Sequence, residues 1–124
     1  MNEIVTKALE HGHTIDITTT GRKSGLPRRI EIEFYNSEGR LYIWGRTATF
    51  RDWFANLQAQ PEFIFHLKGD VQVDLPARAT FITDRAERRN ILSKLIQMTK
   101  SNADLEALVE AGPLVQVTIE TDLQ

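Results

Sequence analysis

Cations and hydroxyls are concentrated in residues 18–28, which read TTTGRKSGLPR. Arg22, Lys23 and Arg28 can each form charge-assisted hydrogen bonds to a phosphate or a carboxylate, and Ser24 adds a hydroxyl group. The backbone of a turn also supplies free N–H groups, which bind anions. The stretch therefore predicts an anion-binding site, and the alternative is a cationic turn that is simply solvated.

The flanking sequence places these cations at the tip of a β-hairpin. Apolar and polar residues alternate over residues 14–18 and again over residues 29–35, as in two strands with one buried face. Gly21 and Gly25 can adopt positive φ and Pro27 fixes its own φ, so we expect a stiff turn. A Walker P-loop is excluded, because its Gly-Lys-Ser/Thr element is followed by a helix.

The other titratable residues do not assemble a catalytic triad or a metal site. Glu31 and Glu33 share one strand face about 7 Å apart, which suits an acid–base pair or, alternatively, a charged solvent face. His11 and His13 have no carboxylate at ligand spacing, so we predict no metal. His66 alternates with aromatic residues and is expected to be a partly buried, hydrogen-bonded histidine.

Aromatic residues flank the predicted loop over residues 46–50. They fit either core packing or an apolar wall for a flat ring. The loop itself adds Arg46 and Thr47 as polar contacts. Together with the cationic turn, it would suit a planar, anionic cofactor. The aromatic residues concerned are Trp44, Phe50, Trp53 and Phe54.

Composition sets the class of protein that can carry such a site. A chain of 124 residues, 41% of them hydrophobic, suits one domain over residues 1–124 with its own core. The net charge of −2 argues against a nucleic-acid partner. The absence of cysteine excludes disulfides and thiolate chemistry. With no apolar run long enough to span a membrane and no signal-peptide pattern, we expect a cytoplasmic protein.

The remaining pattern predicts a mainly β fold with helical connections. A short N-terminal helix over residues 2–10 is expected to end at Gly12. Six short antiparallel strands favour a small barrel, because closing a sheet removes its exposed edges. The strands are expected at 14–18, 29–35, 40–45, 63–68, 71–82 and 114–119, and the other helices at 51–60, 83–98 with Thr83 as its cap, and 102–110.

These motifs together resemble the deazaflavin (F420)-dependent nitroreductase family. The resemblance rests on TTGRKSGLPR, on LYI at 41–43 and on DWFANL at 52–57 followed by Pro61, and it runs from about residue 15 to residue 82. It implies a six-stranded split β-barrel like those of FMN-binding proteins, the cofactor F420 or alternatively FMN, and a homodimer. The implied activity is hydride transfer from F420H2 to a quinone, a nitroaromatic or a similar acceptor. The alternative is a non-catalytic carrier of a flavin, haem or fatty acid.

The resemblance also implies roles for individual residues. The cations of the turn would meet the anionic tail of F420, residues 44–47 would pass along the ring, and Trp53 and Asn56 would support the pocket. Glu31 would lie near the ring and tune it, and no side chain would be catalytic, since the cofactor carries the hydride chemistry. The expected cofactor-binding residues are Arg22, Lys23, Ser24, Arg28, Glu31, Trp44, Gly45, Arg46, Thr47, Trp53 and Asn56.

Overall fold

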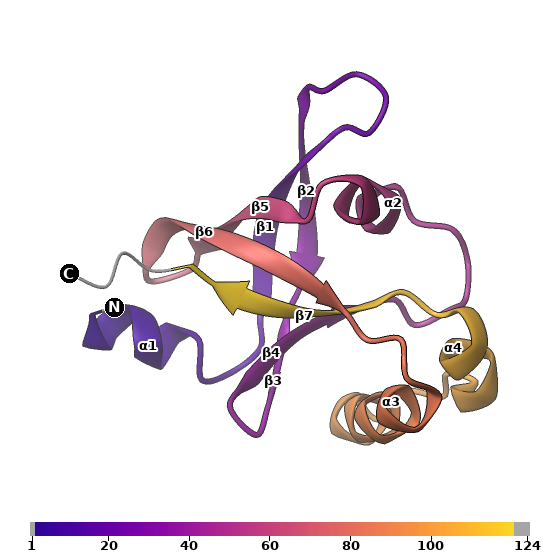
Figure 1. The fold of residues 1–124 in the computed structure, drawn as a ribbon. Coiled ribbons are helices and arrows are strands. Elements are labelled where there is room, and N and C mark those ends of the chain that lie inside the picture. The colour runs from indigo at the N-terminus through magenta and orange to yellow at the C-terminus, as the bar shows by residue number, and fades with distance from the viewer. Residues whose placement is uncertain (1, 121–124) are drawn as a thin grey trace.

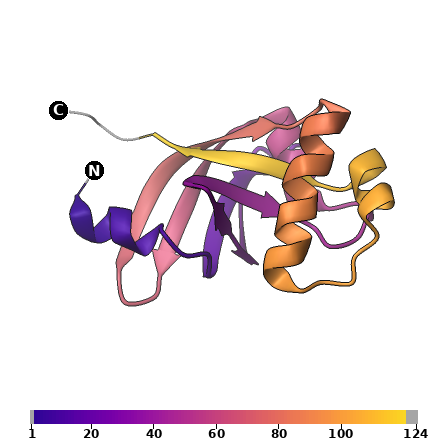
Figure 2. The ribbon, with the colours of Figure 1, turned by 90° about the horizontal axis from the view of Figure 1, so that it is seen from below.

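The computed structural model describes residues 2–120, which form a curled antiparallel sheet with helices at its ends (Figures 1 and 2). The fold is mainly β with helical connections, as predicted. The strands are β1 (Thr14–Thr20), β2 (Pro27–Glu33), β3 (Tyr35–Ser37), β4 (Arg40–Trp44), β5 (Glu62–Lys68), β6 (Gln72–Phe81) and β7 (Leu114–Ile119). The helices are α1 (Glu3–Ala8), α2 (Asp52–Ala59), α3 (Arg85–Thr99) and α4 (Leu105–Ala111).

The sheet has seven strands in the order β2-β1-β5-β6-β7-β4-β3, so the prediction of six strands was wrong. The additional strand is β3, which lies between the strands expected at 29–35 and 40–45 and pairs with β4. β2 and β3 form the two edges of the sheet, and Phe34 alone separates them along the chain. One bent stretch of chain therefore pairs with β1 through its first half and with β4 through its second half.

Apolar and polar residues alternate along the strands, and the apolar side chains on one face form the core. In β1, Ile15, Ile17 and Thr19 are buried, whereas Asp16 and Thr18 point to the other face. One apolar cluster fills the curl of the sheet and includes Phe34 and Phe65, whose rings meet edge to face with centroids 5.1 Å apart. A second cluster packs Trp44 and β7 against α3 and α4, which lie side by side at one end of the sheet (Figure 2).

Gly12 is required by close packing and does not end the first helix. α1 ends at Ala8 with Leu9 as its C-cap, so the expected stop at Gly12 was wrong. A Cβ atom at Gly12 would lie 2.3 Å from the carbonyl oxygen of Phe34, at the bend between β2 and β3. A side chain is therefore excluded at residue 12 by the backbone of the bent strand.

Arg88 joins α3 to its neighbours. Its guanidinium is buried and donates to the carbonyl oxygens of Ile82 (2.9 Å), Leu108 (2.7 Å), Val109 (2.8 Å) and Gly112 (2.6 Å). Three of these carbonyls lie at the C-terminal end of α4, where the helix dipole favours a cation. Burial lowers the pKa of Arg88.

The caps of α3 and α4 are both aspartates. Asp84, and not Thr83 as predicted, caps α3 by accepting from the N–H of Glu87 at 2.9 Å. Asp104 caps α4 in the same way. A carboxylate at this position satisfies a free N–H group and interacts favourably with the helix dipole.

Candidate functional site

A cavity of about 430 Å³ lies between the β1–β2 turn and α2, and we call it the cationic cavity. It brings together residues that are distant in sequence, from the turn, from β2 and from α2. Six of the eleven predicted cofactor-binding residues line it, namely Arg22, Lys23, Ser24, Arg28, Trp53 and Asn56. Thr19, Gly21, Ile30 and Asp52 complete the lining.

The turn over residues 21–26, which we call the cationic turn, is stiffened by its own hydrogen bonds. The N–H of Gly21 donates to Leu26 O at 2.8 Å, and the N–H of Gly25 donates to Gly21 O at 2.8 Å. Gly25 has φ +72°, a conformation that glycine adopts without steric cost. Ser24 Oγ accepts from the N–H of Leu26 at 3.1 Å and from Arg28 at 3.3 Å. The hydroxyl of Ser24 thus organises the turn.

Arg22 holds the cationic turn against α2, so its expected projection from the hairpin tip was wrong. Its guanidinium donates to Asn56 Oδ1 at 2.9 Å and to Asp52 Oδ1 at 3.0 Å. The backbone N–H of Arg22 donates to the same Asn56 oxygen at 3.1 Å, and Asn56 Nδ2 donates to Thr19 Oγ1 at 3.2 Å. Asn56 is 4% exposed, so it connects the turn, β1 and α2 from a buried position.

Lys23 and Arg28 remain available to an anion. Both are exposed, and neither forms an ion pair with any residue in the described range 2–120. Arg28 is held toward the turn by Ser24. The cavity therefore presents two uncompensated cations beside a buried tryptophan, Trp53, which is 8% exposed.

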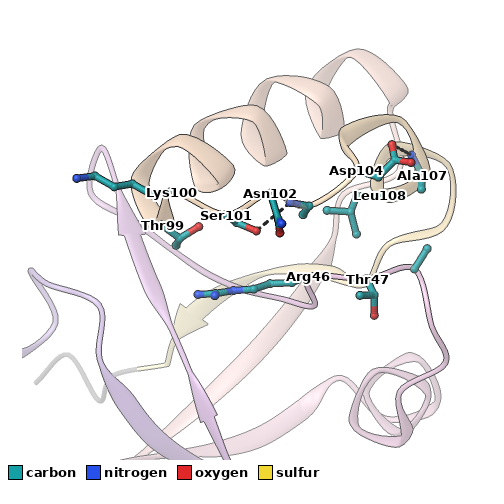
Figure 3. Close-up of a pocket in the computed structure, with 11 residues that line it drawn as sticks. Arg46, Thr47, Thr99, Lys100, Ser101, Asn102, Asp104, Ala107 and Leu108 are labelled. Atoms are coloured by element: carbon teal, nitrogen blue, oxygen red, sulfur yellow. Dashed lines mark hydrogen bonds between the residues drawn. The ribbon is translucent and has the colours of Figure 1, made fainter.

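Arg46 and Thr47 line a different cavity, of about 760 Å³, which we call the loop cavity. Figure 3 shows both residues opposite the end of α3, the connection between α3 and α4, and the first turn of α4, which supply the other lining residues. Arg46 donates to the hydroxyl of Tyr35 at 2.9 Å, and its guanidinium carbon lies 5.9 Å from the centroid of the Trp44 ring. Residues 46–48 line the loop cavity, and the same loop continues to α2, whose residues Asp52, Trp53 and Asn56 line the cationic cavity.

Trp44 and Gly45 line neither of these two cavities. Trp44 is 6% exposed within the second apolar cluster, and its Nε1 has no hydrogen-bond partner among the described residues. Gly45 is also buried, and a Cβ atom there would lie 2.7 Å from the side chain of Pro113. For Trp44 the structure favours core packing, whereas Phe50, at 71% exposure, packs against no core.

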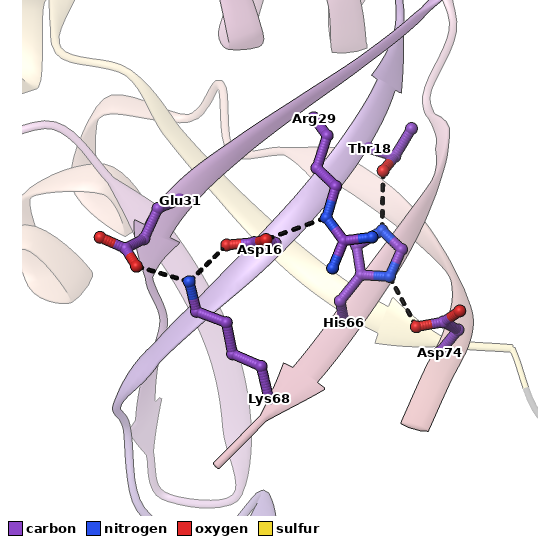
Figure 4. Close-up of polar contacts among 7 residues, drawn as sticks. All are labelled: Asp16, Thr18, Arg29, Glu31, His66, Lys68 and Asp74. Carbon is purple, nitrogen blue, oxygen red and sulfur yellow. Dashed lines mark hydrogen bonds and ion pairs between the residues drawn. The ribbon is translucent and has the colours of Figure 1, made fainter. Parts of the chain in front are cut away.

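Glu31 lies on the face of β2 opposite the cationic cavity. Ile30 lines the cavity, and side chains alternate along a strand, so Glu31 points away. Its carboxylate accepts from Lys68 Nζ, which also donates to Asp16 Oδ1 at 2.6 Å (Figure 4). Glu33 instead accepts from the hydroxyl of Tyr35 at 2.8 Å. The two glutamates thus belong to a charged outer face.

Sequence reasoning missed a polar chain on this outer face. His66 is buried, as predicted, and its Nε2 lies 2.7 Å from Thr18 Oγ1 while its Nδ1 lies 2.7 Å from Asp74 Oδ1 (Figure 4). The bond to His66 lowers the pKa of Asp74. The bonds to Lys68 and Arg29 lower the pKa of Asp16. These partners come from four strands, β1, β2, β5 and β6, so they could be found only with the strand register.

Residues 2–120 contain neither a candidate membrane span nor a candidate metal site. None of the described helices is long and apolar enough to cross a membrane. Within the same range, no group of three or more His, Cys, Asp or Glu side chains is placed to hold a metal ion.

A comparison with models of protein families decides the assignment. Residues 2–122 match the model described as F420H(2)-dependent quinone reductase. The chain belongs to this family. The resemblance inferred from the sequence motifs is thereby confirmed, and the protein is an oxidoreductase whose cofactor is coenzyme F420.

Solved structures share the fold of this F420H(2)-dependent quinone reductase at low sequence identity. A protein named F420 reductase matches with a TM-score of 0.70 and 16% identity, over 98% of this chain and 97% of the other. A conserved hypothetical protein of Mycobacterium tuberculosis gives the same TM-score and identity, over 98% and 82%. A FAD-binding protein of Mesorhizobium loti matches with a TM-score of 0.64 and 17% identity, over 98% and 91%. These likenesses support the fold alone.

Proposed function

We propose that this reductase binds F420 with its anionic tail in the cationic cavity and reduces a quinone at the loop cavity. The observation that carries the proposal is the pair of exposed, unpaired cations, Lys23 and Arg28, in a cavity that also holds Trp53. When bound, F420H2 supplies a hydride, and the protein supplies position and electrostatics. The donor set fits the group, because phosphate and carboxylates are the natural partners of unpaired cations.

The free edge of β2 offers a place for the ring. β2 pairs only with β1 in the described sheet, so alternate residues direct N–H and C=O groups away from it. A planar ring that carries amide-like groups can bond to such an edge. Arg28 and Ile30 of this strand line the cationic cavity, so the tail and ring sites would be continuous.

The loop cavity is the proposed acceptor site. Its volume of about 760 Å³ suffices for a ring system, since ligand pockets of about 300–1,000 Å³ are usual. Arg46 and Thr47 would donate hydrogen bonds to a carbonyl oxygen of the acceptor, and Leu108 and Ala107 supply apolar contacts. The proposed role of Arg46 is to stabilise negative charge that develops on that oxygen.

The tail site is tested by replacing the two free cations. Lys23→Ala/Arg28→Ala should weaken F420 binding by at least about tenfold, because each charge-assisted bond contributes roughly 1.5–3 kcal/mol. Fluorescence titration of purified protein with F420 measures this, and affinity should also fall with added salt. Lys7→Ala/Arg40→Ala removes two cations elsewhere and is the matched control. If the two double variants bind F420 with equal affinity, the F420 tail does not bind in this cavity.

Turnover separates the reductase from a carrier on the same fold. Protein, F420H2 and a soluble quinone are mixed, and the return of oxidised F420 is followed by its absorbance. Catalysed return supports the proposal, and tight binding without turnover would support a carrier. The same titration with FMN tests the alternative cofactor. Nitroaromatic compounds can replace the quinone to define the range of acceptors.

Three further proposals concern the state of the protein. We propose that residues 1–124 form one domain of split-barrel type, that the protein is a homodimer and that it is cytoplasmic. The homodimer is supported by exposed apolar side chains such as Leu26, Ile30 and Phe50, which a second copy could cover. A solution mass that corresponds to one chain at micromolar concentration would contradict it.

A further inference from the structure

A small cavity of about 260 Å³ lies between the β3–β4 hairpin and α3, and we call it the hairpin cavity. It shares no lining residue with the cationic cavity or the loop cavity, so it is a separate site. Its volume is below the range of about 300–1,000 Å³ that is usual for drug-sized ligands, so a ligand for it must be smaller. The lining residues are Ser37, Glu38, Arg40 and Tyr42 of the hairpin and Glu87, Asn90, Ile91 and Lys94 of α3.

Tyr42 brings an unpartnered hydroxyl group to this cavity. The residue is 4% exposed and its ring packs in the second apolar cluster, so the side chain is held in place. The hydroxyl makes no hydrogen bond within residues 2–120, yet the one fully buried polar side-chain atom without a partner in that range is Trp44 Nε1. The Tyr42 oxygen therefore reaches the surface of the cavity. A buried tyrosine usually gives its hydroxyl a partner, so a free one that lines a cavity points to a ligand.

Two charged residues of the hairpin cavity have no ion-pair partner. Arg40 and Glu87 form no ion pair with any residue between 2 and 120. The other two charges neutralise each other, because Lys94 Nζ donates to Glu38 Oε2 at 2.7 Å and holds the pKa of Glu38 below its ordinary value. The lining thus offers one free cation and one free carboxylate, and its four charges cancel.

Neutral polar groups complete the hairpin cavity. The hydroxyl of Ser37 and the amide of Asn90 make no side-chain hydrogen bond within residues 2–120. Each can donate or accept, so they can bind either end of a polar ligand. Glu87, Asn90 and Lys94 are separated by three and by four positions, so they share one face of α3. A helix and a hairpin therefore position these groups, and no long loop is involved.

We propose that the hairpin cavity binds a small zwitterion, a free amino acid, with its carboxylate on Arg40 and Tyr42 and its ammonium group on Glu87. Arginine forms strong, often bidentate bonds with a carboxylate, and an ionised glutamate accepts from an ammonium group. A simple anion would leave Glu87 unpaired and a simple cation would leave Arg40 unpaired, whereas a zwitterion complements both charges. This binding site goes beyond the reaction with F420 and does not depend on it.

Isothermal titration calorimetry tests the site on the full chain, without F420 or quinone. The standard L-amino acids are titrated one at a time, and acetate and methylammonium serve as probes for the two charged halves of the ligand. At least one amino acid should bind with a Kd of about 1 mM or below, at least about tenfold more tightly than either half.

Three variants test the groups that are proposed to hold the ligand. Tyr42→Phe removes only the hydroxyl and should weaken amino-acid binding at least about threefold, whereas Arg40→Gln and Glu87→Gln remove a charge-assisted bond and should weaken it at least about tenfold. The matched control is Glu10→Gln, which removes another exposed carboxylate that has no ion pair within residues 2–120 and should bind as the natural chain does.

Three results would overturn the proposal. They are the absence of binding by every amino acid at up to about 10 mM, acetate that binds as tightly as the best amino acid, and equal binding by Glu87→Gln and Glu10→Gln. The second result would make the ligand a simple carboxylate. Thermal unfolding shows that each variant is folded before the comparison, and Tyr42→Phe should unfold as the natural chain does, because its hydroxyl has no partner within residues 2–120.

Discussion

Asn56 is expected to be the most sensitive polar residue of the site, and Asn56→Ala tests this. Its side chain makes three hydrogen bonds, two as acceptor from Arg22 and one as donor to Thr19. Each neutral bond contributes about 0.5–1.5 kcal/mol, and loss of a partner leaves a buried group unsatisfied. The bond from the guanidinium contributes less than a fully buried charged bond, because the Arg22 side chain is 26% exposed and keeps Asp52.

The sum gives an expected loss of about 2–4 kcal/mol in the free energy of unfolding. Urea denaturation measures it, followed by the fluorescence of the buried Trp44 and Trp53, with an unchanged m-value. Asn90→Ala is the control, because Asn90 is exposed on α3 and makes no side-chain hydrogen bond within residues 2–120. Its effect should stay within about 0.5 kcal/mol.

A loss below about 1 kcal/mol for Asn56→Ala would refute the reasoning, since it would mean that the cationic turn holds its position without α2. Asn56→Asp provides a second check. It keeps an acceptor for Arg22, and the Thr19 hydroxyl can donate to it, so it should recover part of the stability. F420 affinity should follow the same order, because the turn that carries Lys23 is fixed through Asn56.

Four shorter predictions follow from other contacts. Gly12→Ala should cost about 1–3 kcal/mol, measured by thermal unfolding against Gly69→Ala, because a Cβ at Gly12 meets backbone and one at Gly69 meets nothing within 4 Å. Arg88→Met should cost more than about 3 kcal/mol, since it leaves four carbonyl groups without their donor, and an effect below about 1 kcal/mol in urea would contradict the account. The hydrogen bond to His66 holds the pKa of the Asp74 carboxyl below its ordinary value of 3.8, so the contribution of Asp74 to stability is present above pH 3.8 and is lost as the pH falls through the folded pKa; Asp74→Asn should flatten the acid limb of the stability curve. Glu31→Gln should leave F420 affinity and the pH–rate profile unaltered, and a shifted profile would place Glu31 near the ring.

Much of the fold could be predicted because the strands alternate clearly. β3 was missed because it has only three residues, which is too short for a periodic signal next to a turn. The helix stop at Gly12 was wrong because a glycine required by tertiary packing has the same sequence signature as one that ends a helix.

The candidate site, like the fold, could be predicted from the sequence only in part. The cationic turn is a local feature, and its sequence indicated both its stiffness and its charge. The pairing of Arg22 with α2 depends on a contact across 34 positions of the chain, which no local pattern encodes. Residues 99–104, 107 and 108, which line the loop cavity, have neither a motif nor a charge cluster that would single them out. The face on which Glu31 lies followed from strand alternation, whereas its role came from the family resemblance alone.

The strand order has a consequence for the synthesis of the protein. β4 pairs with β3 and β7 only, and β7 lies between β4 and β6, so the last strand to leave the ribosome joins two parts of the sheet. Until residues 114–119 emerge, the β3–β4 hairpin has no other strand to join, and both β4 and β6 expose an unpaired edge. The nascent chain is thus open to association until β7 has been synthesised. A ribosome-stalled chain that ends at residue 113 should be digested by protease within the β3–β4 hairpin, and protection there would contradict this order of assembly.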